Sequence, residues 1–381
     1  MSKHTTRADL LSVVVSPGKA RTAVLLALGL AMLASTTGCA AARRDVRATG
    51  EPDSYAKLGY RLAWGGFPLM ERGGRVARVA AMDDIFLVQT KGGAVTAIET
   101  DTGRTRWATP LGGATTNFVG LGRAGDRILV ASDTDLYIFN AVTGGQEDRH
   151  EFAVIASTPP AVVGDFAVFG SVTGQAFGHD LVTGFKSWGY TLHGSVRAAP
   201  VATNDVVFVA SEGGDVIVLD PASGSSVGRD RIFGGTASNP VAGSGAFFLA
   251  SLDQAMYAFS AADGRMLWRR LSEQPIRSQP SLVDGVVYVD IPGEGLVAIN
   301  STTGSDLWTS PDASGRVVGK RAGRLIVWTG AGALLVNTRT GAVEDRAPLP
   351  ALHDLIMSPN VDGDLYAVAA QGVVTKYAPR N

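Results

Sequence analysis

The residues that could carry out chemistry are few and scattered along the chain. Cys39 is the single cysteine among 381 residues, so a disulfide framework, a cysteine-ligated zinc site and an iron–sulfur cluster are excluded. The histidines after residue 38 are His150, His179, His193 and His353. None of them has the spacing from another histidine or from a cysteine that is typical of a metal-ligand pair. The run Arg149-His150-Glu151 is typical of a solvated outer strand. The sequence therefore predicts no catalytic residue, metal site or cofactor, and we expect a protein that is not an enzyme.

Three arginines suggest a binding site instead. When the repeated units are aligned on Pro200, Pro280 and Gly319, an arginine stands three residues before each of them, in the innermost strand of the fold inferred below. These arginines are Arg197, Arg277 and Arg316. Because innermost strands line a central channel, these side chains could form a positive rim at its mouth, suited to an anionic ligand or an acidic partner segment. The alternative is that they are solvated loop residues paired with carboxylates of nearby turns, of which the candidates are Glu212, Asp253 and Glu294.

One turn offers a second candidate binding element. The segment 290–295 carries Ile291 and Pro292 at its tip, where other units have polar residues or glycine. An exposed apolar tip can anchor a protein partner. Ordinary packing against the neighbouring turn is the alternative.

These candidates belong to a repeated unit of about forty residues. A Thr-Gly turn, or a close relative of it, recurs every 37 to 41 residues. Its seven occurrences are Thr102-Gly103, Thr143-Gly144, Thr183-Gly184, Ser223-Gly224, Asp263-Gly264, Thr303-Gly304 and Thr340-Gly341. A period of this length, with short strands and turns, is typical of a β-propeller with one four-stranded blade per repeat.

The strands of one unit can be read directly from the pattern. The sequence predicts strands at 276–282, 286–290, 296–300 and 305–310, separated by glycine-containing turns. After Gly341 there is room for only three strands, and the segment Tyr60–Trp64 resembles the fourth strand of other units. We therefore predict an all-β, eight-bladed propeller of four-stranded antiparallel blades over residues 59–381, closed into a ring by the N-terminal strand. Seven blades is the main alternative.

Composition agrees with such a fold and excludes some partners. Glycine accounts for 47 residues and charged residues for 18%, against a usual charged fraction of about 25%. The 45% hydrophobic content excludes a disordered chain. The formal net charge of −1 excludes a nucleic-acid binder held by general basicity.

The N-terminal segment is predicted to be a targeting signal. Basic residues precede a stretch of thirteen uncharged residues, 22–34, which is too short for a stable transmembrane helix. The small residues before Cys39 resemble the lipobox of bacterial lipoproteins, although Thr36 stands where that motif prefers leucine. We expect a lipoprotein signal peptide over 1–38, lipidation of Cys39 and a flexible tether over 39–58. The alternative is an ordinary signal peptide that precedes a buried cysteine.

The repeat itself resembles that of the pyrroloquinoline-quinone-type propellers. Ala97-Ile98-Glu99, Thr102-Gly103 and Trp107 match its pattern, and similar strings recur in later units. The resemblance implies that the conserved indole of each unit docks against the neighbouring blade. The matching tryptophans are Trp64, Trp107, Trp188, Trp268 and Trp308, and three units have Asp148, Gly228 or Asp345 instead. The junctions of those three units are expected to be weaker.

With the lipobox and eight repeats, the chain is similar to the BamB-like lipoproteins of the outer-membrane β-barrel assembly machinery. This resemblance implies a non-catalytic scaffold that is anchored by lipid in the cell envelope, at the outer membrane on its periplasmic side, with a barrel insertase as protein partner. An envelope binding module for an anionic or polymeric ligand at the channel mouth is the alternative. A quinone-dependent dehydrogenase is the third reading, but the cysteine pair that clamps the quinone in those enzymes cannot form here.

Overall fold

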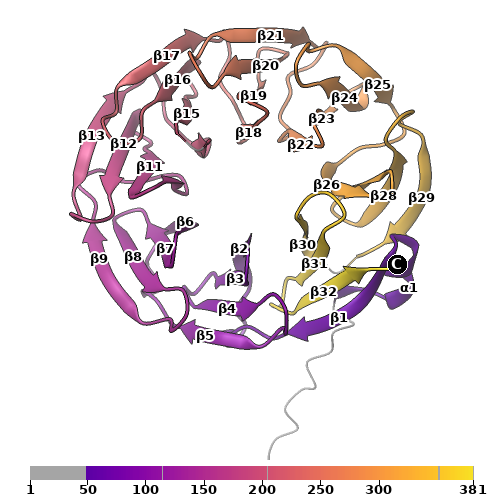
Figure 1. The fold of residues 1–381 in the computed structure, drawn as a ribbon, viewed down its shortest axis with the longest axis horizontal. Helices are drawn as coiled ribbons and strands as arrows, with labels where there is room; N and C mark the ends of the chain where they lie inside the picture. Colours follow the sequence, from indigo (N-terminus) through magenta and orange to yellow (C-terminus); the bar gives the residue numbers. More distant parts are fainter. Residues whose placement is uncertain (1–48, 114, 204, 351, 381) are drawn as a thin grey trace, which may run out of the picture. The chain divides into compact units, whose positions relative to one another are not determined.

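A computed structural model describes residues 49–113, 115–203, 205–350 and 352–380. The predicted signal peptide, the lipidation site Cys39 and the first half of the predicted tether lie outside the described residues. Within them the chain forms eight four-stranded antiparallel sheets arranged as the blades of a ring (Figure 1). The eight-bladed propeller predicted from the repeat is therefore confirmed. No helix in the part of the chain that the structure describes is both long enough and apolar enough to cross a membrane.

The first four blades follow one another along the chain, each starting with its innermost strand. Blade 1 contains β2 (Val76–Met82), β3 (Ile85–Thr90), β4 (Val95–Glu99) and β5 (Thr105–Thr109). Blade 2 contains β6 (Phe118–Ala124), β7 (Arg127–Ser132), β8 (Asp135–Asn140) and β9 (Gln146–Glu151). Blade 3 contains β10 (Ala161–Val163), β11 (Phe166–Gly170), β12 (Gln175–Asp180) and β13 (Lys186–Thr191). Blade 4 contains β14 (Val201–Ala202), β15 (Val207–Ala210), β16 (Asp215–Leu219) and β17 (Ser226–Arg231).

The last four blades complete the circle. Blade 5 contains β18 (Val241–Gly243), β19 (Ala246–Ser251), β20 (Ala255–Ser260) and β21 (Met266–Leu271). Blade 6 contains β22 (Ser281–Val283), β23 (Val286–Ile291), β24 (Gly295–Asn300) and β25 (Asp306–Ser310). Blade 7 contains β26 (Arg316–Arg321), β27 (Arg324–Trp328), β28 (Gly332–Asn337) and β29 (Val343–Pro348). Blade 8 contains β30 (Leu352–Ser358), β31 (Asp364–Ala369), β32 (Val374–Pro379) and, from the other end of the chain, β1 (Tyr60–Gly66).

The ring closes in blade 8, as predicted. Strand β1 pairs antiparallel with β32, with Tyr60 opposite Pro379 and Gly66 opposite Val374. Because one blade is built from both ends of the chain, opening the ring would break a complete strand ladder.

The hydrophobic core lies between the blades. Buried side chains form eight clusters, each shared by two successive blades, within the residues that the structure describes. In the cluster between blades 4 and 5, for example, Phe208 of one blade stacks on Phe247 of the next with ring centroids 5.0 Å apart. Stability therefore depends on contacts between neighbouring repeats.

Two boundaries differ from the sequence prediction. The strand expected at 276–282 is only β22, because Pro280 has no backbone N–H for the ladder and the residues before it form the connection between blades. The tether expected to reach residue 58 is too long, because α1 (Pro52–Lys57) folds onto the ring. Tyr55 of this helix stacks on Tyr377 with ring centroids 3.6 Å apart, and the Ser54 hydroxyl donates to the Pro348 carbonyl. Burial of Tyr55 and Leu58 holds α1 in place.

Candidate functional site

Strand direction divides the connections between two faces of the ring. The connections between blades lie beside the turns that join second and third strands, as the hydrogen bond from Leu192 N–H to the Gly174 carbonyl illustrates. We call this the loop face. The Thr-Gly turns and the turns between first and second strands lie at the opposite strand ends, and we call that side the turn face.

The three predicted arginines all belong to the loop face but have different environments. Arg197 is exposed and its Nε lies 3.3 Å from Glu212, one of the carboxylates that the alternative interpretation named. Arg316 begins β26 and its Nη2 lies 2.6 Å from Asp354 of blade 8. Arg277 is exposed and has no ion pair within the described ranges. Two of the three guanidinium groups are therefore already matched by carboxylates, which leaves Arg277 available.

The other two carboxylates considered from the sequence have different partners. Asp253 accepts hydrogen bonds from the Tyr257 hydroxyl at 2.7 Å and from the Phe233 N–H at 3.1 Å. Glu294 accepts from Arg270, which also reaches Asp306 on the outer strand of the same neighbouring blade. Arg270 therefore ties blade 5 to blade 6, and the two acids raise its pKa further above its ordinary value, chiefly through their hydrogen bonds.

The structure brings Arg277 and the predicted apolar turn together. Both border a cavity of about 490 Å³ on the loop face between blades 6 and 7, which we call the Arg277 pocket. Its wall includes Ser278, Asp290, Pro292, Pro311 and Ser314. Pro292 is exposed at the rim. The pocket thus combines one unpaired guanidinium group with proline rings on the turn and on the connection beside it.

The prediction that Ile291 is exposed is wrong. Ile291 is fully buried as the last residue of β23, in the cluster between blades 5 and 6 with Ile276. The turn is tighter than a free loop because Ile291 still pairs with Gly295, so only Pro292 to Glu294 project beyond the ladder.

Asp290 organises the wall of the Arg277 pocket. Its Oδ2 accepts hydrogen bonds from the Ser314 hydroxyl at 2.7 Å and from the Gly315 N–H at 2.9 Å. Its backbone carbonyl accepts from the Ser278 hydroxyl. These bonds hold one oxygen of Asp290 against the connection that enters blade 7, and among the described residues no ion pair joins Asp290 to Arg277.

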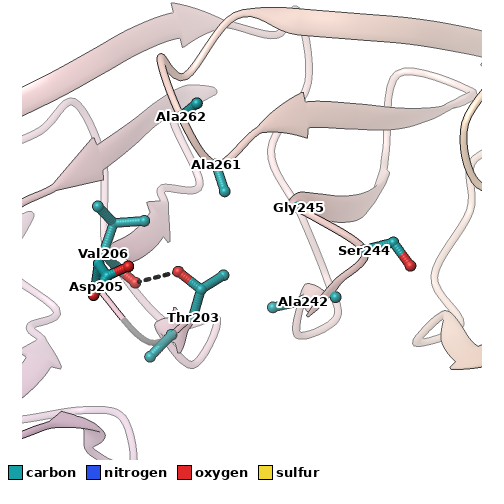
Figure 2. Close-up of a pocket in the computed structure, with 10 residues that line it drawn as sticks. Thr203, Asp205, Val206, Ala242, Ser244, Gly245, Ala261 and Ala262 are labelled. Carbon is teal, nitrogen blue, oxygen red and sulfur yellow. Dashed lines mark hydrogen bonds between the residues drawn. The ribbon is translucent and has the colours of Figure 1, made fainter.

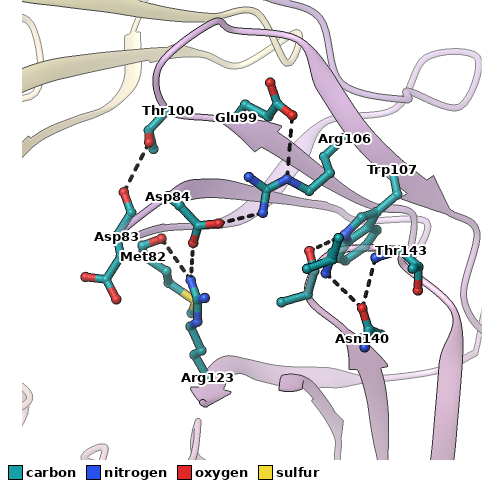
Figure 3. A network of polar contacts seen from close by, with 12 residues as sticks. Met82, Asp83, Asp84, Glu99, Thr100, Arg106, Trp107, Arg123, Asn140 and Thr143 are labelled. Atoms are coloured by element: carbon teal, nitrogen blue, oxygen red, sulfur yellow. Dashed lines mark hydrogen bonds and ion pairs between the residues drawn. The ribbon is translucent and has the colours of Figure 1, made fainter. Parts of the chain in front are cut away.

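The five predicted tryptophans all lie at blade junctions. Each indole Nε1 donates to a backbone carbonyl in the next blade, at 2.8 to 3.0 Å. The acceptors are Thr100 for Trp64, Ala141 for Trp107, Pro221 for Trp188, Ser301 for Trp268 and Thr338 for Trp308. Figure 3 shows Trp107 reaching the turn that carries Asn140 and Thr143.

The same geometry explains the glycine of the Thr-Gly turn. Gly304 has φ of +73°, in the left-handed region, and a Cβ at that position would lie 2.6 Å from the Trp268 ring. The turn glycine is therefore required both by its conformation and by the indole of the preceding blade. The sequence pattern paired each Thr-Gly with the tryptophan that follows it, whereas the contact is with the tryptophan before it.

The three junctions without tryptophan are filled in three different ways. Between blades 2 and 3, His150 is buried and its Nδ1 lies 2.9 Å from Nε2 of His179, while Asp148 contacts the other nitrogen of His150 at 3.1 Å. The expectation that His150 is solvated is therefore wrong. Burial, and secondarily the charge of His150, lowers the pKa of His179 to about 4.

The remaining two junctions use backbone and helix. Between blades 4 and 5, Gly228 lies directly on the turn of the next blade, where a Cβ would be 1.9 Å from the Asp263 carbonyl oxygen. Between blades 7 and 8, beside Asp345, the junction is covered by α1 with Tyr55 and Leu58. No periodic signal marks these substitutes, because their contact residues are far apart in the sequence.

Three kinds of catalytic site do not fit the described residues. The string Gly224 to Gly228 reads Gly-Ser-Ser-Val-Gly, the spacing of a nucleophile elbow, but it forms the hairpin between β16 and β17 and no helix follows it. Among the described residues, no cluster of three or more His, Cys, Asp or Glu side chains could hold a metal ion. A quinone clamp does not fit either, because five indoles are engaged at blade junctions and the sixth, Trp328, is buried in a cluster between blades 7 and 8.

Comparison with known proteins shows what the chain is similar to. The family model described as outer membrane protein assembly factor BamB matches residues 56–199, 148–227 and 212–381. Outer membrane protein assembly factor BamB of Bordetella pertussis is 30% identical over 162 residues, 41% of this chain and 42% of that protein. The matched region of this chain therefore covers about two fifths of the length of that relative. Tetrathionate hydrolase of Acidianus ambivalens is 37% identical over 54 residues, 14% of this chain and 10% of that enzyme.

A solved structure has the same architecture. The crystal structure of BamB from Moraxella catarrhalis has a TM-score of 0.67 to this chain at 21% sequence identity. The match covers 84% of this chain and 97% of that one. At this identity the likeness concerns the fold.

Proposed function

Because the chain belongs to the outer membrane protein assembly factor BamB family, we propose that it is a non-catalytic scaffold that assists the assembly of outer-membrane β-barrel proteins. The observation that carries the proposal is the family match over residues 56–381, which includes every blade of the ring. The relative from Bordetella pertussis bears the same description. A rigid closed ring with short connections suits a protein that presents surfaces to partners.

We further propose that the scaffold is held in the cell envelope by a lipid on Cys39 and that it faces the periplasm. Cys39 follows a predicted signal peptide and is the single thiol of the chain. Ten peptide units separate it from Thr49, the first described residue, so even a fully extended chain would span at most about 35 Å between them. A short tether would keep the scaffold close to partners in the same membrane.

The Arg277 pocket is our proposed contact for the protein partner, with the barrel insertase as the expected one. A partner segment with one carboxylate and adjacent apolar side chains would match the free guanidinium and the proline rings at its rim. Arg197 and Arg316, whose charges are paired, would contribute less. This arrangement favours a protein segment over an anionic polymer spread around the channel mouth.

The experiment is co-purification with the lipidated, full-length protein from membranes, comparing wild type with Arg277→Glu. We expect the wild type to recover a barrel insertase and Arg277→Glu to recover at most a tenth as much. Arg104→Glu is the matched control, because Arg104 is also exposed but belongs to a Thr-Gly turn on the turn face. Equal recovery by both variants would remove the Arg277 pocket from the proposal, and absence of any insertase would overturn the proposed function.

The absence of catalysis is also part of the proposal. The match to tetrathionate hydrolase covers 54 residues, little more than one repeat. Such a short match supports the interpretation that the two proteins share the repeat and do not share an active site. Hydrolysis of tetrathionate by the purified full-length chain, above the level of a Ser226→Ala variant, would contradict it.

A further inference from the structure

An ion-pair cluster joins blades 1 and 2 on the turn face (Figure 3). Asp84, in the turn between β2 and β3, accepts hydrogen bonds from Arg106 of its own blade and Arg123 of blade 2, both at 2.6 Å. Arg123 also donates to the Met82 carbonyl. Burial opposes ionisation of Asp84, but the bonds from the two arginines outweigh it and lower the pKa of Asp84 to about 2. A turn carboxylate and a cation from the next blade therefore form a matched pair.

The device recurs between blades 6 and 7. Lys320 of β26 lies 2.5 Å from Asp284 of the turn between β22 and β23. Lys320 pairs with Leu325 in its ladder, and Arg123 pairs with Ile128, so the two cations occupy the same position of the innermost strand. At these two junctions the innermost strand of the following blade supplies a cation to a turn aspartate of the preceding blade, Asp84 being the second residue of its turn and Asp284 the first.

Between blades 4 and 5 the aspartate is present and the cations are missing. Asp205 ends the turn between β14 and β15 as Asp84 ends the turn between β2 and β3. Ala242, paired with Phe247, stands where Arg123 stands, and Val227, at the bulge of β17, stands where Arg106 stands. Within the ranges that the structure describes, Asp205 has neither an ion pair nor a side-chain hydrogen bond.

A cavity of about 610 Å³ lies at this junction (Figure 2). We call it the Asp205 pocket. Methyl groups of Ala242, Ala261 and Ala262 line it together with the polar groups of Thr203 and Ser244. Arg265, on the same turn as Ala262, is engaged with Asp263 at 2.6 Å. The pocket therefore has one unmatched negative charge and apolar walls where the junctions of blades 1 and 2 and of blades 6 and 7 hold the stem of a cationic side chain.

We propose that the Asp205 pocket receives an arginine side chain from a protein partner, in the place that Arg123 fills between blades 1 and 2. The partner's guanidinium would pair with Asp205 and its methylene stem would contact the alanine methyl groups. Thr203 stands in the position of Met82, so its carbonyl is placed to accept the additional hydrogen bond. The site is on the turn face and is independent of the proposed contact at the Arg277 pocket.

The test follows the alanine methyl NMR signals of the full-length, detergent-solubilised chain during titration with N-acetyl-arginine methylamide. Saturable shifts of the Ala242, Ala261 and Ala262 signals are expected. The neutral isostere N-acetyl-citrulline methylamide should shift them at least tenfold less at equal concentration. Equal shifts with citrulline, or none with arginine up to 50 mM, would overturn the proposal, and a lysine analogue that binds more tightly would also overturn the choice of arginine.

Variants make the test specific. Asp205→Asn is expected to weaken the interaction about tenfold, and Ala242→Arg to abolish it by filling the site from within. Asp126→Asn is the matched control, because Asp126 has the same turn position in blade 2 but Val162 of blade 3 occupies the strand position that Ala242 has in blade 5. An unchanged affinity in Asp205→Asn, or an equal loss in Asp126→Asn, would contradict the assignment even if Ala242→Arg failed to fold.

Discussion

Replacement of one docked tryptophan should measure what holds neighbouring blades together. Trp268 is only 8% exposed, contacts Phe248 with ring centroids 5.9 Å apart and donates to the Ser301 carbonyl at 2.8 Å. Truncation of such a side chain removes a buried indole and leaves a cavity at the junction, so Trp268→Ala should lower the free energy of unfolding by about 3–5 kcal/mol. For a ring of this size, that loss corresponds to a decrease in Tm of about 4–7 °C.

The assay is thermal and urea unfolding of the full-length chain, with a double-mutant cycle. Gly304→Ala alone should be destabilising, because it places a Cβ 2.6 Å from the Trp268 ring at a φ of +73°. In the Trp268→Ala background the clash is gone and only the conformational cost of about 1 kcal/mol should remain. Leu267→Ala, one residue away and 52% exposed, should change stability by less than about 0.5 kcal/mol. An unchanged Tm in Trp268→Ala, or strictly additive effects, would refute the docking argument.

Three further predictions concern other parts of the chain. The pKa of His179 is lowered from 6.5 to about 4 in the folded chain, so the unfolded chain binds this proton more tightly. The free energy of unfolding, measured by urea titration, should therefore fall as the pH drops from about 6.5 to 4. His179→Gln should make the free energy of unfolding less dependent on pH in this range, and an unchanged dependence would contradict the prediction. Asp84→Asn should lower the free energy of unfolding by about 1 kcal/mol, a value that allows for the exposure of the Asp84–Arg123 ion pair. Asp205→Asn should lower it by less than about 0.5 kcal/mol. Equal losses in urea titrations would show that the two aspartates have similar environments. Cys39→Ser should move the protein from the membrane to the soluble fraction on cell fractionation, and continued membrane association would exclude lipid on Cys39 as the anchor.

The fold could be predicted from the sequence because its signals are local and periodic. A turn glycine about every forty residues and a tryptophan on five of the eight fourth strands report contacts that recur around the ring. The missing last strand and the segment around Trp64 were enough to predict the closure by β1. Periodicity could not predict which blade each indole contacts, because the same spacing fits the preceding and the following turn.

The candidate sites were only partly predictable, because they occur where the repeat is broken. The burial of His150 depends on His179 in the next blade, and the order of residues 52–58 depends on Tyr377 at the other end of the chain. Ile291 looks like a loop tip in the sequence but is the end of a strand. The Asp205 pocket is visible only after blades 2 and 5 are compared in register, which shows that Ala242 replaces Arg123.

The most direct test of the proposed scaffold role is the amount of folded outer-membrane β-barrel protein in cells that lack this chain. Folded barrels migrate differently from unfolded ones in unheated gel samples, so their ratio can be measured by quantitative immunoblotting. Loss of the protein should lower the folded fraction, wild type should restore it, and Arg277→Glu should restore it incompletely. A folded fraction that stays unchanged when the protein is removed would contradict a role in barrel assembly.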